Sequence, residues 1–243
     1  MITARPTVDK ALNLTQLRRI PMQRPDNAGA YWQGIPHGDL ASCIIDACTA
    51  RSWGVTNTRF ITNRGGSELA GVIDVDIPKV KPPKGQSFSL GFLTSNDRKR
   101  ALKLTVGTNV FVCSNGLVTG EIILRRKHTL GLDLAADLNP ALDTYVTKAQ
   151  SINEMVERLR DRKLKTTMVD KILMEAGRAE LMPWSRIGDV DHEYRNPRFA
   201  EHGKDTSWAL LQAFTWVVKQ NPPLAQMEQI NSFRKMLPMI SAA

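Results

Sequence analysis

The sequence has few cysteines, few aromatic residues and no long hydrophobic run. Its cysteines, Cys43, Cys48 and Cys113, are odd in number and lack C-x-x-C spacing, so we expect buried, reduced thiols and a cytoplasmic location. No stretch approaches about 18 consecutive apolar residues, which excludes a membrane-spanning helix. The N-terminus lacks the apolar segment of a secretory signal, which also favours the cytoplasm.

Motifs of the common catalytic classes are missing as well. The chain has no G-x-x-x-x-G-K-[ST] loop, which excludes a P-loop ATPase, and its histidines form neither an H-E-x-x-H motif nor a zinc pattern. We therefore expect neither enzymatic activity nor a cofactor. One alternative stays open, a metal-dependent nuclease that binds Mg²⁺ or Mn²⁺ through Asp189, Asp191, His192 and Glu193.

Length and composition are those of an ordinary globular protein. The chain has 243 residues, of which 42% are hydrophobic and 23% charged, so neither a disordered chain nor a disulfide-stapled miniprotein fits. We predict a single α+β domain over residues 1–243, an antiparallel β-meander of five or six strands covered by long C-terminal helices. Its parts are a helical and loop segment (1–54), the β-meander (55–130) and a helical region (138–243).

Apolar alternation predicts the strands, and apolar residues at three- and four-residue spacing predict the helices. The expected strands are 55–62, 69–77, 88–94, 101–106, 109–113 and 121–126. The expected helices are 8–20, a helix capped by Asp39 that ends at Gly54, 141–164, 169–176, a helix capped by Thr206-Ser207 that ends at 220, and 224–237.

Positive charge is concentrated in the middle of the chain. Thirty-three Lys and Arg against 24 Asp and Glu leave a net charge of +9, and nearly all of the excess lies in residues 79–165. This favours a polyanionic partner, and because aromatic residues are only 6% we expect phosphate contacts rather than base-specific recognition. The predicted nucleic-acid-binding residues are Arg98, Lys99, Arg100, Lys103, Arg125, Arg126, Lys127, His128, Arg158, Arg162 and Lys165.

We expect these cations to converge into one continuous track. A strand over residues 98–106 would lie beside the strand that carries Arg125 and Lys127, forming a basic stripe across a sheet. One face of a helix would form a second wall, made of Arg158, Arg162 and Lys165. The hypothesis is therefore a sequence-nonspecific protein that prefers single-stranded DNA.

Several strings resemble the landmarks of the phage/plasmid-like protein family of unknown function. They are Ile35-Pro36-His37, Thr94-Ser95-Asn96-Asp97, Val110-Phe111-Val112-Cys113-Ser114-Asn115-Gly116-Leu117, Lys127-His128-Thr129 and the string from Thr206 to Thr215. Gln212 departs from the family, which commonly has Asn there. The resemblance implies a bacterial cytoplasm and a role that serves a phage, prophage or plasmid, without a named activity.

The order of a β-meander followed by long helices is also similar to phage single-strand annealing recombinases of the Red-beta, Erf and RecT type. This similarity implies a homo-oligomer that holds DNA by its phosphates and anneals complementary strands in recombination without ATP. An alternative from a different class is a counter-defence or host-factor-binding protein without enzymatic activity, whose basic face binds an acidic surface of a host protein.

Overall fold

The computed structural model describes residues 11–63, 65–110, 122–221 and 238–240. The strands form one antiparallel sheet in the order β1-β2-β3-β4-β5: β1 (Gly54–Thr62), β2 (Glu68–Asp76), β3 (Gln86–Ser95), β4 (Leu102–Val110) and β5 (Ile122–Arg126). The helices are α1 (Leu14–Arg18), α2 (His37–Ala50), α3 (Leu134–Asp161), α4 (Thr166–Arg178), α5 (Trp184–Arg195), the 3-10 helix η1 (Ala200–His202) and α6 (Ser207–Lys219). The predicted α+β class, with long helices after a meander, is confirmed.

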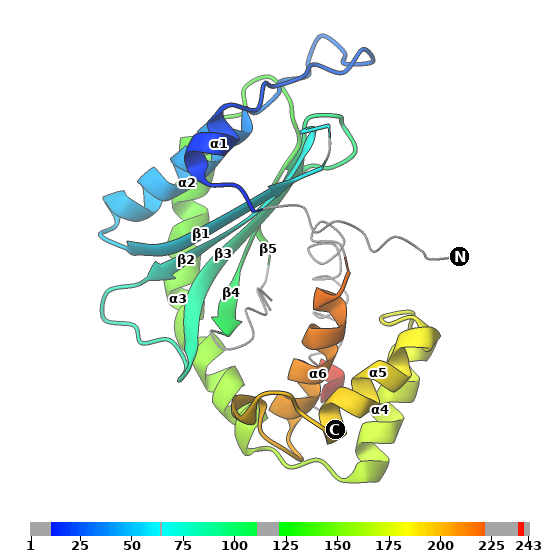
Figure 1. Cartoon of the computed structure of the whole chain (residues 1–243). Helices are drawn as coiled ribbons and strands as arrows, with labels where there is room; N and C mark the ends of the chain where they lie inside the picture. Colours follow the sequence, from blue (N-terminus) through cyan, green and yellow to red (C-terminus); the bar gives the residue numbers. More distant parts are fainter. Residues whose placement is uncertain (1–10, 64, 111–121, 222–237, 241–243) are drawn as a thin grey trace.

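One face of the sheet packs against α2 and the first half of α3, and we call this the inner face (Figure 1). Because side chains alternate along a strand, every second residue of the central strands faces these helices, as do Phe88, Leu90 and Phe92 of β3. Gly71 lies opposite Phe92, and a Cβ at Gly71 would lie 2.2 Å from the Phe92 ring, so this position admits no side chain.

Tyr145 fastens α3 to the middle of the sheet. Its fully buried hydroxyl accepts a hydrogen bond from the Ser89 amide (3.0 Å) and donates one to the Gly107 carbonyl (2.8 Å). Ser89 and Gly107 lie opposite each other on β3 and β4, so a single hydroxyl links the helix to two strands. Burial raises the pKa of Tyr145 well above its usual value, which keeps the hydroxyl protonated as a donor.

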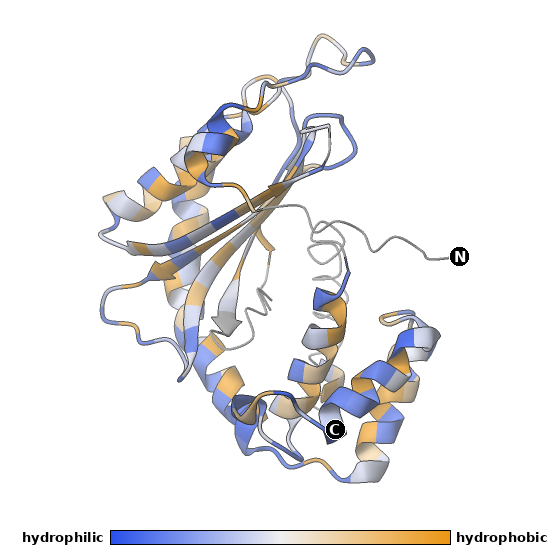
Figure 2. Cartoon of the chain, in the orientation of Figure 1, coloured by the Kyte–Doolittle hydropathy of each residue, from blue (hydrophilic) through white to orange (hydrophobic). Residues whose placement is uncertain are grey.

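A second hydrophobic core lies beyond the sheet, where the C-terminal half of α3 packs against α4, α5 and α6. Figure 2 shows hydrophobic positions on these neighbouring helices. Thr206 caps α6 as predicted, because its hydroxyl accepts the Ala209 amide (3.0 Å). Gln212 on α6 is buried, and its Oε1 has no hydrogen-bond partner in the described part of the chain. No described helix is long and apolar enough to cross a membrane.

Several predicted boundaries are wrong. The expected break between the strands 101–106 and 109–113 is absent, since β4 continues through Gly107 to Val110, and residues 111–113 lie outside the described residues. Asp39 lies in the first turn of α2 rather than at its cap, and α2 ends at Ala50. Helix α3 begins before Pro140, because the Asp133 side chain accepts the Ala136 amide (3.0 Å) and starts the helix there.

Other predictions lie outside the described residues. These are the helix 224–237, Cys113 and residues 111–117 of the string from Val110 to Leu117. Of the remaining thiols, Cys48 is buried and Cys43 half-buried, and both are free. Burial raises the pKa of Cys48 to about 12, as expected of an unreactive core thiol.

The variant Tyr145→Phe is expected to unfold more easily. Removing the hydroxyl leaves the Ser89 amide and the Gly107 carbonyl buried without this partner, which costs about 1–3 kcal/mol. The measurement is urea unfolding followed by circular dichroism. Tyr31→Phe, at an exposed tyrosine, is the matched control and leaves the unfolding midpoint unchanged. Equal midpoints for Tyr145→Phe and the natural protein would contradict the role given to Tyr145.

Candidate nucleic-acid interface

Four segments distant in sequence meet at one end of the sheet, which we call the hairpin end. They are the β1–β2 turn, the β3–β4 hairpin, the segment 21–36 before α2 and the connection 127–133 from β5 to α3. Asn96 in the hairpin holds Ile35 by two hydrogen bonds, accepting its amide (3.0 Å) and donating to its carbonyl (2.9 Å). The Asn96 amide itself donates to the Ser67 carbonyl of the β1–β2 turn (2.7 Å).

Two buried histidines lie inside the hairpin end. His128 shares a 2.8 Å hydrogen bond with the Thr94 hydroxyl and stacks on Trp32, with ring centroids 6.4 Å apart. The Nε2–H of His37 donates to the Gly66 carbonyl (2.9 Å). The Nδ1 atoms of both imidazoles have no hydrogen-bond partner among the described residues. The predicted phosphate contact of His128 is therefore not available in this structure, because the ring is in the interior.

Burial lowers the pKa of both histidines, since a buried imidazole favours the neutral form. For His37 the hydrogen bond with Gly66 opposes this effect, and repulsion from His128 adds to it. The pair is thus a neutral, structural part of the hairpin end at pH 7.

Several of the predicted cations at the hairpin end have partners. Arg98 is not in a strand, because its φ of 70° places it in the hairpin turn, and its guanidinium donates to the Asn27 carbonyl. Three other predicted cations each form an ion pair with a carboxylate: Lys99 with Asp97 (3.0 Å), Arg100 with Glu68 (3.4 Å) and Arg126 with Asp137.

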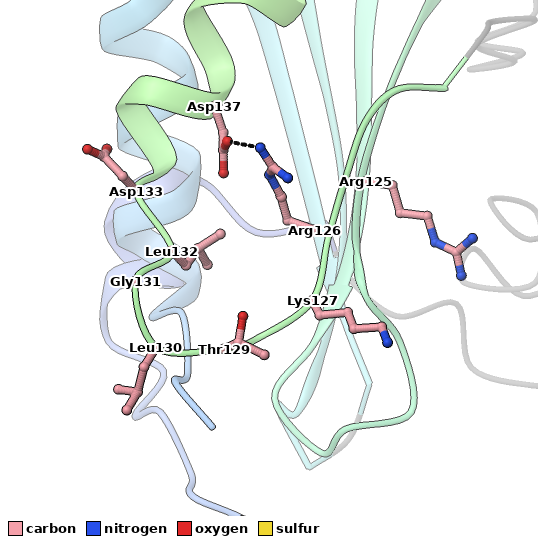
Figure 3. A pocket seen from close by; sticks show the side chains of 9 residues that line it. All are labelled: Arg125, Arg126, Lys127, Thr129, Leu130, Gly131, Leu132, Asp133 and Asp137. Carbon is pink, nitrogen blue, oxygen red and sulfur yellow. Dashed lines mark hydrogen bonds and ion pairs between the residues drawn. The ribbon is translucent and has the colours of Figure 1, made fainter. Parts of the chain in front are cut away.

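Of the predicted cations at the hairpin end, Lys103, Arg125 and Lys127 have neither a carboxylate nor a carbonyl partner within the described ranges. Lys103 on β4 lies directly opposite Arg125 on β5. Their strand neighbours Leu104 and Leu124 belong to the inner core, so alternation puts both cations on the opposite face, which we call the outer face. In Figure 3 the side chains of Arg125 and Lys127 extend to the same side, away from Asp137.

A pocket of about 480 Å³ lies where β5 turns into α3 (Figure 3). Arg126 and Asp137 face each other across it, and Asp133 at its edge caps α3. The Asp137 carboxylate is therefore already paired with Arg126, and the Asp133 carboxylate already caps α3. The cationic groups that remain open at this site are those of Arg125 and Lys127.

The other predicted cations lie at the far end of α3. Arg158 is 21 positions beyond Asp137, which corresponds to about 30 Å along the helix. Arg162 follows the helix end, with φ −77° and ψ 111°, so Arg158 and Arg162 do not share a helical face as expected. Lys165 precedes α4. The predicted single track is thus divided into two groups at opposite ends of α3.

The proposed metal ligands do not converge. Asp189, Asp191, His192 and Glu193 lie on α5, where successive residues point in different directions. Their carboxylates face arginines: Asp189 pairs with Arg186 (2.7 Å), Asp191 with Arg195 (2.9 Å) and the buried Glu193 with Arg198 (3.0 Å). Among the described residues, no group of three His, Cys, Asp or Glu could hold a metal ion.

Sequence reasoning missed two residues, Tyr31 at this site and Arg59 on the opposite edge of the sheet. Arg59 on β1 shares the outer face, and its Nε and Nη2 are buried without a hydrogen-bond partner in the described part of the chain. The alternation of Asn57 and Arg59 with the buried Phe60 could have indicated it. Tyr31, in the segment before α2, is 79% exposed. No periodic pattern surrounds Tyr31, so only its position in a glycine- and proline-rich loop could have indicated it.

Comparison with known proteins gives a family and no activity. Residues 84–236 match the model of a family described as Domain of unknown function (DUF932). No curated protein and no solved structure matches the chain. The matched range includes β3, β4, β5 and α3, and with them Lys103, Arg125 and Lys127.

The buried histidines make the stability of the fold depend on pH. Because their pKa is below the unfolded value of 6.5, the unfolded chain binds more protons just below this pH. Their contribution is complete above pH 6.5 and is lost as the pH falls toward the folded-state pKa. We expect urea midpoints to decrease from pH 7 to pH 5, and to decrease less in His128→Gln.

The exposed His192 provides the control, and His192→Gln retains the full pH dependence of the natural protein. An independent measurement is a proton NMR titration of the imidazoles. A His128 pKa at or above 6.5 would contradict the burial argument.

Proposed function

We propose that this chain, which belongs to this family of domains of unknown function, is a nucleic-acid-binding protein that holds single-stranded DNA by its phosphates at the hairpin end. The observation that carries the proposal is the pairing of Lys103 with Arg125 on the outer face, with Lys127 just beyond and no carboxylate partner for any of them among the described residues.

Two like charges directly opposite each other in an antiparallel pair destabilise the sheet, because their Cβ atoms are only about 5 Å apart. Most cations nearby escape this cost through a carboxylate, as Arg100 does with Glu68. A phosphate between Lys103 and Arg125 would relieve the repulsion and accept hydrogen bonds from both side chains. The arrangement therefore favours an anionic ligand.

The ion-paired cations of the hairpin end can add to this site. The pairs of Lys99 with Asp97 and of Arg126 with Asp137 are exposed on the cationic side, and exposed ion pairs contribute little to stability. A phosphate can therefore compete with either carboxylate. Because such contacts are made to the DNA backbone, they carry no sequence preference.

We also propose that the protein serves a phage or plasmid. Three of the strings that resemble the phage/plasmid-like family, at Ile35–His37, Thr94–Asp97 and Lys127–Thr129, lie together at the hairpin end. This supports a role that serves a phage or plasmid in a bacterial cytoplasm. Annealing of complementary strands by a homo-oligomer is part of the same proposal, supported by the order of a β-meander followed by long helices.

The double variant Lys103→Gln/Arg125→Gln is expected to bind a single-stranded oligonucleotide more weakly. Each phosphate contact that is lost also lowers the slope of log affinity against log salt by about 0.7. The measurement is fluorescence anisotropy over a salt titration. The matched control, Lys171→Gln/Lys204→Gln, removes the same charge from exposed positions elsewhere and retains the slope. Equal slopes for the two double variants would contradict the site, and absent or salt-independent binding by the natural protein would contradict the function.

The variant Asp137→Asn is expected to act in the opposite direction. It removes the carboxylate that pairs with Arg126, so this cation becomes available to DNA. Affinity for the oligonucleotide and the salt slope should both rise, measured in the same anisotropy assay. Asp143→Asn provides the comparison, because Asp143 lies on the same helix but pairs with Arg51, the residue that follows α2. A lower affinity of Asp137→Asn would show that Arg126 does not contact DNA.

A further inference from the structure

The most exposed of the large hydrophobic side chains in the described residues is at the hairpin end. Tyr31 is 79% exposed, and Leu130 beside it is 60% exposed. The Leu130 amide donates to the Tyr31 carbonyl (2.9 Å), and Trp32 and Thr129 form an antiparallel bridge next to them. Two exposed apolar residues from distant parts of the sequence are thus held at neighbouring backbone positions.

The backbone at Tyr31 is fixed although its ring is exposed. The next residue, Trp32, is buried and stacks on His128, with 11° between the ring planes. The Arg24 guanidinium lies 5.5 Å from the centre of the Trp32 ring and donates to the Gly29 carbonyl (3.2 Å). The ring of Tyr31 is therefore presented to solvent from a firmly held segment, and ordering it on a ligand costs little conformational entropy.

Cations lie on the two segments that carry this exposed ring and Leu130, and on the neighbouring β3–β4 hairpin. Lys127 and Leu130 line the same pocket, and Arg98 contacts the Asn27 carbonyl in the segment that carries Tyr31. An exposed aromatic ring at the same end of a sheet as cations without a carboxylate partner suits single-stranded nucleic acid, since bases can stack on the ring while phosphates contact the cations. A patch for an acidic protein would need the cations but not a solvent-exposed ring.

We propose that Tyr31 is a stacking platform for an unpaired nucleobase and that it selects single strands over duplex DNA. The inference rests on the proposed function and adds to it the residue that distinguishes the two substrates. Bases in a duplex are stacked on one another and cannot offer their faces to Tyr31, whereas the phosphates remain accessible to Lys103, Arg125 and Lys127 in both substrates.

The test compares Tyr31→Ala with the natural protein on a single-stranded oligonucleotide, on the same strand in duplex form, and on an abasic strand of equal length. We expect Tyr31→Ala to lower single-strand affinity by roughly 5- to 150-fold, the range that base stacking gives. Duplex affinity and the salt slope should stay unchanged, and Tyr31→Trp should restore binding. On the abasic strand, Tyr31→Ala and the natural protein should bind equally.

Met174→Ala, at an exposed apolar residue of α4, controls for the loss of an exposed side chain. Single-strand affinity that Tyr31→Ala leaves unchanged would overturn the inference while leaving the proposed function intact, and it is the result expected if Tyr31 contacts a protein instead. Equal losses on normal and abasic strands would overturn it too. Failure of the natural protein to bind any of the strands would overturn the proposed function itself.

Discussion

The shared use of α3 by two hydrophobic cores is the constraint on which the rest of the structure depends. Its first half packs Leu142 and Tyr145 on the sheet, and its second half packs Val156 and Leu159 against α4, α5 and α6. A helix of 28 residues is about 42 Å long, so the two cores are spaced along it. This spacing separates the cations of β4 and β5 from those that follow α3.

Much of the fold could be predicted because its signals are local. The alternation in β2, from Leu69 to Val75, and the three- and four-residue spacing in α3 both record which side of an element is buried. The positions where helices and strands begin and end were harder to predict from the sequence. The start of α3 depends on one hydrogen bond from Asp133, and Pro140 inside the helix suggested a later start. The unbroken course of β4 through Gly107 depends on pairing with Ser89, which is a contact across the sheet.

The candidate site could be predicted only in part, because a run of cations gives position in sequence but not the partner of each charge. Arg100 meets Glu68, a residue 32 positions away, and the burial of His128 depends on Thr94 and on Trp32 from a different segment. The pairing of Lys103 with Arg125 was accessible in principle, since two adjacent strands with alternating patterns bring such residues together. The exposure of Tyr31 was less accessible, because a glycine- and proline-rich loop does not by itself show that Trp32 is buried while Tyr31 faces solvent.

The register of β5 ties the position of its charges to the position of its apolar residues. Leu124 enters the core because Arg125 points the other way, and one residue more or less in this short strand would exchange them, burying a guanidinium and exposing a leucine. This requirement applies to the part of β5 from Leu124 to Arg126, because the register shift between Leu104 and Thr105 already accommodates one extra residue, Ile123, before it. The part of β5 that carries these charges therefore keeps its alternation of core and surface residues, and the connection after it is held in length by the hydrogen bonds of His128 and Leu130 to the segment before α2.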